Sequence, residues 1–213
     1  MSARLSESIV LRTFPLREAD LIVSFLARDL GKLRGVARRA RKPGNRFGSG
    51  LQRLSYVRME YFHRENRDLD SLDGCEILRS HFGLASGYEP AAALDYFAEV
   101  ADQLLPAAEP NEKFFRLLLA VSDYLDGAGE AGIWTAVTYY SLWAVRLGGF
   151  LPPMELSEED RAIAEEMLRK PVAELTYAAW SKHTAIGLRR KLVRLLEDHI
   201  ERKLLTAAFL EAL

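Results

Sequence analysis

Residues 30–59 read LGKLRGVARRARKPGNRFGSGLQRLSYVRM, and the pattern of this stretch indicates how the first part of the chain folds. From Lys32 to Arg38, basic or small residues alternate with apolar ones. Because successive side chains of a strand point to opposite faces, the alternation predicts a strand with one buried and one cationic face. Residues 41–50 are rich in Gly, Pro, Asn and Ser, which is typical of a loop. A second alternation, Leu54 to Phe62, predicts another strand.

Three further apolar runs flank this stretch and predict strands of their own. They are Ser8–Phe14, which we expect to end at Pro15, then Asp20–Leu26, and the weaker Leu69–Leu78. Five short strands within about eighty residues favour a small closed antiparallel barrel. An SH3-like barrel is the competing topology, and the pattern does not separate the two.

After His81 the hydrophobic period becomes that of helices. It predicts helices over residues 91–105, 112–125, 133–147, from Ser157 to 170, and 184–205. The third is apolar nearly all round and should lie at the centre. The last should carry a buried stripe that includes His199 and a basic stripe that includes Arg189, Arg190 and Arg194. The predicted fold class is therefore α+β, with a five-stranded barrel over residues 1–80 and an all-α domain over 81–213.

Charge is distributed unevenly along the chain. It has 29 Lys and Arg and 30 Asp and Glu, and nine of the basic residues but none of the acids lie in residues 30–59. A segment of this charge is a candidate site for a polyanion such as a phosphate backbone. The candidate contacts are the strand and loop cations Lys32, Arg34, Arg38, Arg39, Arg41, Lys42 and Arg46.

Aromatic residues lie within and beside this window, at Phe47, Tyr56, Tyr61 and Phe62. They could stack on bases, or they could belong to the barrel core. The window contains no base-reading motif, so the expected nucleic-acid binding is independent of sequence.

Other classes of protein find little support. The single Cys75 excludes an internal disulfide and a Cys-x-x-Cys module, and the four histidines are scattered. We find no phosphate loop, no Gly-x-Ser-x-Gly, no apolar stretch of about 20 residues and no apolar signal sequence. We therefore expect a cytoplasmic protein that is not an enzyme, with no catalytic residues, no metal and no cofactor.

The tryptophan-rich helix allows two interpretations. Trp143 can belong to the helical core, or it can form a groove with Arg116 and Arg146 beside Phe115 that receives an acidic-hydrophobic peptide.

Several stretches in order resemble the bacterial RecO family of recombination mediators. The resemblance covers most of the chain and rests on Val10–Thr13 with Glu18–Val23, Gly31–Lys42, Arg46–Gly48 with Leu51–Gln52, Arg146–Pro152, and the final helix with its Leu-Arg-Arg start at Leu188. It implies an oligonucleotide-binding (OB) barrel, followed by a helical domain. It also implies binding of single- and double-stranded DNA, annealing of complementary strands, and, together with RecR, help in loading RecA onto DNA covered by single-strand-binding protein. By analogy, the helical domain would contact the acidic C-terminal tail of that protein, and the location would be the cytoplasm, in association with the nucleoid.

Two departures from the family pattern matter. Many members carry a four-cysteine zinc module after the Gly-Phe-Leu-Pro stretch, whereas here Pro152–Leu156 leads directly to Ser157, so we expect no structural zinc. Members often have a basic stretch near the C-terminus, where this chain has Leu205–Ala208. An RNA-binding barrel protein and a protein-interaction module with a basic face remain the alternatives.

Overall fold

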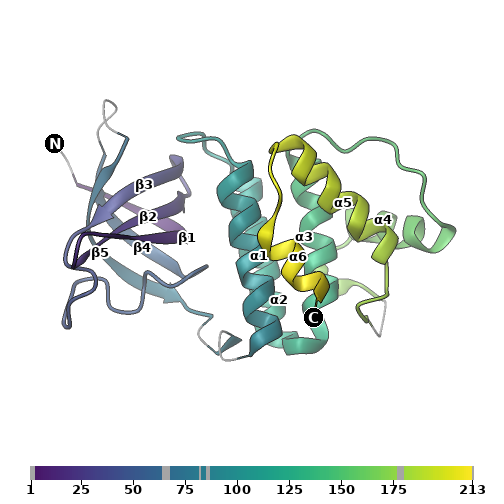
Figure 1. Ribbon diagram of the computed structural model, residues 1–213, viewed down its shortest axis with the longest axis horizontal. Coiled ribbons are helices and arrows are strands. Elements are labelled where there is room, and N and C mark those ends of the chain that lie inside the picture. The colour runs from purple at the N-terminus through teal and green to yellow at the C-terminus, as the bar shows by residue number, and fades with distance from the viewer. Residues whose placement is uncertain (1–2, 64–67, 82, 85–86, 177–179, 213) are drawn as a thin grey trace. The chain divides into compact units, whose positions relative to one another are not determined.

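A computed structural model describes residues 3–63, 68–81, 83–84, 87–176 and 180–212. Five strands form a closed barrel in the order β1-β2-β3-β5-β4, and helices follow them along the chain (Figure 1). This confirms the predicted fold class, and the strand order, which returns from β4 to β1, is that of an OB barrel. The strands are β1 (Arg4–Leu16), β2 (Asp20–Ala27), β3 (Gly31–Ala37), β4 (Tyr56–Phe62) and β5 (Asp70–Arg79).

The barrel interior is filled by the apolar half of each alternating strand. Val10, Val23, Phe25, Val57 and Met59 are completely buried. β1 runs past Pro15, where we expected it to end, because it stays paired with β2 through Leu16 opposite Asp20. Proline lacks an N–H donor, but at the end of a strand the loss affects few ladder bonds.

The helices are α1 (Tyr88–Leu104), α2 (Glu112–Ala128), α3 (Ile133–Leu147), α4 (Glu158–Arg169), α5 (Ile186–His199) and α6 (Leu205–Ala212), with short 3₁₀ turns η2 (Gly129–Gly132) and η3 (Val172–Glu174). The predicted single last helix is wrong, because residues 200–204 separate α5 from α6. His199, predicted in the buried stripe, is exposed, and its ring stacks on Phe150 with the ring centroids 3.9 Å apart.

The chain divides into two compact units, residues 1–82 with 101–115, and residues 83–100 with 116–213. The barrel unit thus includes the end of α1 and the start of α2, which the sequence did not indicate. The boundary expected after residue 80 remains a prediction.

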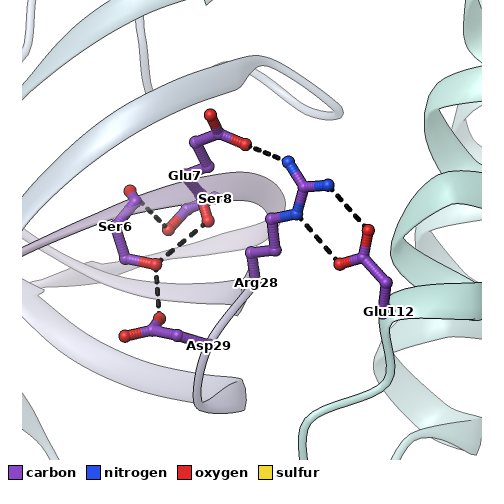
Figure 2. Close-up of polar contacts among 6 residues, drawn as sticks. All are labelled: Ser6, Glu7, Ser8, Arg28, Asp29 and Glu112. Atoms are coloured by element: carbon purple, nitrogen blue, oxygen red, sulfur yellow. Dashed lines mark hydrogen bonds and ion pairs between the residues drawn. The ribbon is translucent and has the colours of Figure 1, made fainter.

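Within the barrel unit, Arg28 at the end of β2 ties residues 101–115 to the strands (Figure 2). Its Nη1 donates to Glu7 Oε2 at 2.5 Å, while Nε and Nη2 donate to the two Glu112 carboxylate oxygens at 2.9 and 2.7 Å. The neighbouring Ser6 hydroxyl donates to Asp29. This arginine is therefore occupied by two carboxylates.

In the helical unit, α3 lies at the centre as predicted. Eleven of its fifteen residues are buried, and it packs against α4 and α5. The Tyr140 hydroxyl donates to the carbonyl of Phe97 at 2.8 Å, and the hydroxyls of Tyr96 and Ser141 lie 2.7 Å apart. These bonds satisfy polar groups that would otherwise be costly to bury. No helix among the described residues has the length and apolar character needed to cross a membrane.

Candidate nucleic-acid interface

The turn after β3 presents four neighbouring cations to solvent. The protein holds its backbone in place, since the Arg39 N–H donates to Asp20 Oδ1 at 2.8 Å and the Arg41 N–H to the Ala19 carbonyl at 3.0 Å. Arg39 adopts a left-handed conformation with φ of 58°. The exposed side chains are Arg38, Arg39, Arg41 and Lys42, and none forms an ion pair with a described residue. We call these four residues the basic turn.

A second cationic group lies on the outer face of β1, β2 and β3. Arg12 on β1 is paired with Ser24 on β2, which is paired with Arg34 on β3. The two guanidinium groups lie over the Phe14 ring, with Cζ 5.0 Å (Arg12) and 5.6 Å (Arg34) from its centroid. Sequence reasoning omitted Arg12, although its two-residue spacing from Phe14 places both on one face of the strand.

Two of the seven predicted contacts already have partners inside the barrel unit. Lys32 Nζ donates to the Asp102 carbonyl at 2.5 Å, and burial lowers the pKa of this half-buried lysine. Arg46 Nη1 lies 2.5 Å from Asp73 Oδ2, although its side chain stays 73% exposed. Among the predicted contacts and Arg12, the cations without an acidic partner in the described part of the chain are therefore Arg12, Arg34, Arg38, Arg39, Arg41 and Lys42.

The loop beyond the basic turn is anchored by one amide and one aromatic side chain. Asn45 Oδ1 accepts hydrogen bonds from the Phe47 and Gly48 N–H groups at 2.8 and 3.0 Å, and its Nδ2 donates to the Lys42 carbonyl at 2.9 Å. Phe47 is 3% exposed and packs in the barrel core. The loop is thus an ordered extension of the barrel.

The aromatic residues proposed as base-stacking platforms divide into two groups. Phe47 and Tyr61 are buried, which agrees with their alternative interpretation as core residues. Tyr56 and Phe62 are half-buried, and the Tyr56 ring meets Phe115 edge to face at 6.0 Å. Phe14, which is not one of these four residues, has two cations over its ring, Arg12 and Arg34.

The residues of the predicted peptide groove lie on two helices, Arg116 on α2 and both Trp143 and Arg146 on α3. Arg146 lies over the Trp143 ring at 5.5 Å, and Trp143 Nε1 donates to the Met167 carbonyl at 3.0 Å. Arg116 is exposed on α2. The groove remains a prediction.

A different pocket in the helical unit surrounds Arg189, which the sequence placed on the basic stripe of its helix. Arg189 is only 5% exposed, and its guanidinium lies over the Trp134 ring at 4.6 Å. It donates to Thr138 Oγ1 at 3.2 Å, to the Thr184 carbonyl at 3.0 Å and to the Lys182 carbonyl. Burial lowers its pKa to about 10, so it is cationic at neutral pH.

No carboxylate among the described residues forms an ion pair with Arg189. The adjoining pocket has a volume of about 380 Å³, and Val137, Val193 and Leu210 add apolar surface to it. Its border carries both charges: Arg190 lies 3.3 Å from Glu211 and Lys203 lies 2.6 Å from Glu197, whereas Arg194 forms no ion pair with a described residue. A buried cation with only neutral acceptors, beside an apolar hollow, suits a ligand that is both acidic and apolar.

Comparisons with known proteins point to one family. Residues 1–81 match the family model described as recombination protein O N terminal, and residues 86–155 match the one described as recombination protein O C terminal. A protein of Koribacter versatilis named DNA repair protein RecO is 41% identical over 242 residues, covering 98% of each chain. Proteins of the same name from Geobacter metallireducens and Bifidobacterium animalis are 33% and 39% identical, covering 59% and 54% of this chain and 51% and 48% of their own lengths.

The alignment with the Koribacter protein is longer than this chain, 242 positions against 213 residues. The relative therefore has at least 29 positions without a counterpart here.

Proposed function

This chain belongs to the recombination protein O family, and from that premise we propose that it is a non-enzymatic mediator of DNA repair and homologous recombination. It binds single- and double-stranded DNA without sequence preference and anneals complementary strands. Together with RecR it helps RecA to load onto DNA covered by single-strand-binding protein. It acts in the cytoplasm, in association with the nucleoid.

The free cations on the barrel carry this proposal. Arginine and lysine contact phosphates, which every DNA sequence offers in the same pattern. The basic turn is held through its backbone, and its side chains form no ion pair with a described residue, so they have none there to break before they bind. Arg28, which lies between Glu7 and Glu112, would have to break two.

Annealing follows from the same electrostatics. Two complementary strands repel one another, and a cationic surface that holds both lowers this repulsion. Such a mechanism needs no catalytic residue, and the cations Arg34, Arg38, Arg39, Arg41 and Lys42 supply the charge.

The pocket beside Arg189 supports contact with the acidic tail of the single-strand-binding protein. A tail carboxylate would meet Arg189 or Arg194, while an apolar side chain would occupy the hollow beside Val137. In this pocket the cation Arg189 is buried beside a hollow, whereas Arg116 and Arg146 of the predicted groove are both exposed. We therefore prefer the pocket as the partner site.

Reversing the charge of the basic turn tests DNA binding. If five side chains contact phosphates on single strands, the logarithm of the binding constant falls with the logarithm of salt concentration at a slope of about −3.5. The double variant Arg39→Glu with Arg41→Glu should bind more weakly at every salt concentration, with a slope of about −2. Fluorescence anisotropy over a salt series measures both quantities.

The matched control is Arg161→Glu with Arg202→Glu, which changes the net charge equally at two exposed arginines of the helical unit. It should keep the wild-type slope. An unchanged affinity and slope in the Arg39 and Arg41 variant would falsify the assignment of the site. A strong preference for RNA without annealing would favour the RNA-binding alternative, and negligible binding of either would favour the protein-interaction module.

A further inference from the structure

A pocket opens on the barrel unit where β3 and β5 separate. The two strands pair in parallel only from Gly35 to Ala37, opposite residues 70–72. Nearer its start, β3 is met instead by residues 107–109, and the Ala108 N–H donates to the Lys32 carbonyl at 2.9 Å. Gly31 permits this approach, because a Cβ there would lie 2.1 Å from the Glu109 carbonyl oxygen.

The pocket has a volume of about 640 Å³, within the range of about 300–1,000 Å³ typical of small-ligand sites. Its chemistry is divided between two sides. Lys32 and Arg34 make one side cationic, His63, Asp68 and Asp70 make the other acidic, and Ile22, Leu33 and Leu69 add apolar surface.

The acidic side is built around a buried pair. Asp70 is 5% exposed, and its two carboxylate oxygens lie 3.0 and 3.1 Å from His63 Nδ1. A hydrogen bond from Nδ1–H to this carboxylate fixes the imidazole ring and leaves Nε2 as the nitrogen that can meet a ligand. Nε2 makes no hydrogen bond to a described residue.

Resting on the proposed function, the geometry points to a site that accepts one unstacked nucleotide of single-stranded DNA. Its phosphate meets Arg34, whose guanidinium also lies over Phe14. Its base enters between the apolar surfaces, and an N–H donor on the base edge, such as N3–H of thymine, faces His63 Nε2 or the exposed carboxylate of Asp68. A ligand with an anionic end and a donor-bearing end matches both sides of the pocket, whereas a bare phosphate matches only one.

The pocket distinguishes single from double strands. A base in a duplex is stacked and paired, and extracting it costs a few kcal/mol. A single strand offers its bases at a much lower cost. The pocket therefore adds affinity for single strands, while the basic turn serves both forms through phosphates alone.

Filling the pocket tests this inference. Ala107 lies exposed at its border, so Ala107→Phe adds bulk without removing a polar group, and Ala107→Ser is the control at the same position. Affinity for a thymidine oligonucleotide should fall about 10-fold in Ala107→Phe, which corresponds to one lost base contact. Affinity for a blunt duplex should stay within about twofold. A 2-aminopurine placed within the single strand should lose its binding-dependent fluorescence change in the same variant.

The second variant, His63→Gln, removes the imidazole while keeping a polar side chain, and should show the same selective loss. Losses that are equal on single strands and duplexes, or no loss on either, would overturn the inference. So would inorganic phosphate competing with the oligonucleotide as well as thymidine monophosphate does. If the wild-type protein binds neither form of DNA, the proposed function itself fails. If the wild-type protein binds DNA and the pocket variants keep both duplex and single-strand binding, only the inference about the pocket fails.

Discussion

At the scale of single residues, the cations of this chain differ in what their charges meet. Arg28 contacts two carboxylates, and Arg58 lies 2.5 Å from Glu76, whereas Arg39 contacts none among the described residues. Ion pairs with carboxylates compete with the binding of phosphate, so of these three arginines only Arg39 can bind phosphate without first breaking an ion pair to a described residue. A charge count in the sequence treats all three alike.

One acidic residue makes a pH-dependent contribution to stability. Glu166 accepts hydrogen bonds from Lys170 Nζ at 2.7 Å and from the Thr176 hydroxyl and N–H at 2.5 and 3.1 Å. The bonds from Lys170 and Thr176 lower its pKa from 4.5 to about 2. Because the folded-state pKa is lowered, the stabilisation is present above pH 4.5 and is lost as pH falls towards 2.

We therefore expect Glu166→Gln to lower the free energy of unfolding at pH 7, with the difference from wild type shrinking between pH 4.5 and 2. Urea unfolding over a pH series measures this. Glu165→Gln is the comparison, since Glu165 forms only an exposed ion pair with Arg169 at 2.9 Å and should change little. A difference for Glu166→Gln that stays constant with pH would contradict the assignment.

The sequence predicted most candidate contacts but not their local partners. Alternation placed Arg34 on the outer face of its strand, where the structure has it exposed. It could not show that Lys32 turns to the Asp102 carbonyl, because residue 102 lies far along the chain in another type of element. Arg189 was expected on the basic stripe of its helix, but it lies against Trp134. The sequence could not show this either, because residues 134 and 189 lie far apart along the chain.

At the scale of elements, local signals predicted the ends that local chemistry determines. The predicted helix 133–147 matches α3, and Ser157 caps α4 by accepting a hydrogen bond from the Asp160 N–H at 3.1 Å. The break between α5 and α6 was missed because it lacks the usual glycine. Glu201 takes the left-handed conformation there, with φ of 53°, and the Arg202 N–H donates to the Glu197 carbonyl at 3.1 Å.

Glycine at position 201 should stabilise the protein. A left-handed conformation costs a residue with a Cβ about 1–2 kcal/mol, and the greater freedom of glycine in the unfolded chain offsets part of the gain. We expect Glu201→Gly to raise the free energy of unfolding by about 0.5–1 kcal/mol in denaturant titrations. Glu201→Ala keeps the strain and should stay within about 0.5 kcal/mol of wild type. If both variants raised the free energy of unfolding equally, the cause would be the loss of the Glu201 carboxylate and not relief of the left-handed backbone.

At the scale of the whole molecule, each compact unit contains its own candidate site for an anion. The basic turn and Arg34 belong to the barrel unit, and Arg189 and Arg194 belong to the helical unit. The change of hydrophobic period after His81 predicted the change from strands to helices. It did not predict that residues 101–115 join the barrel unit, because a helical pattern carries no information about which unit a helix packs against.

Since no residue is shared between the two sites, their ligands should be separable by mutation. Arg194 is exposed at the pocket border and forms no ion pair with a described residue, so Arg194→Glu should retain the fold. Affinity for a synthetic peptide that ends in an acidic run and an apolar residue should fall about 10-fold, as for the loss of one charge-assisted hydrogen bond. Affinity for duplex DNA should stay within about twofold, because a single exposed charge on the helical unit is screened at physiological salt.

The reciprocal variant completes this test. Arg39→Glu with Arg41→Glu should lose DNA and keep the peptide, as measured by anisotropy with each ligand labelled in turn. Each variant then loses one ligand and keeps the other. A general effect of net charge cannot produce this result, because both changes make the net charge of the chain more negative. If each variant instead weakened both ligands in proportion to the charge removed, long-range electrostatics and not two distinct sites would account for binding.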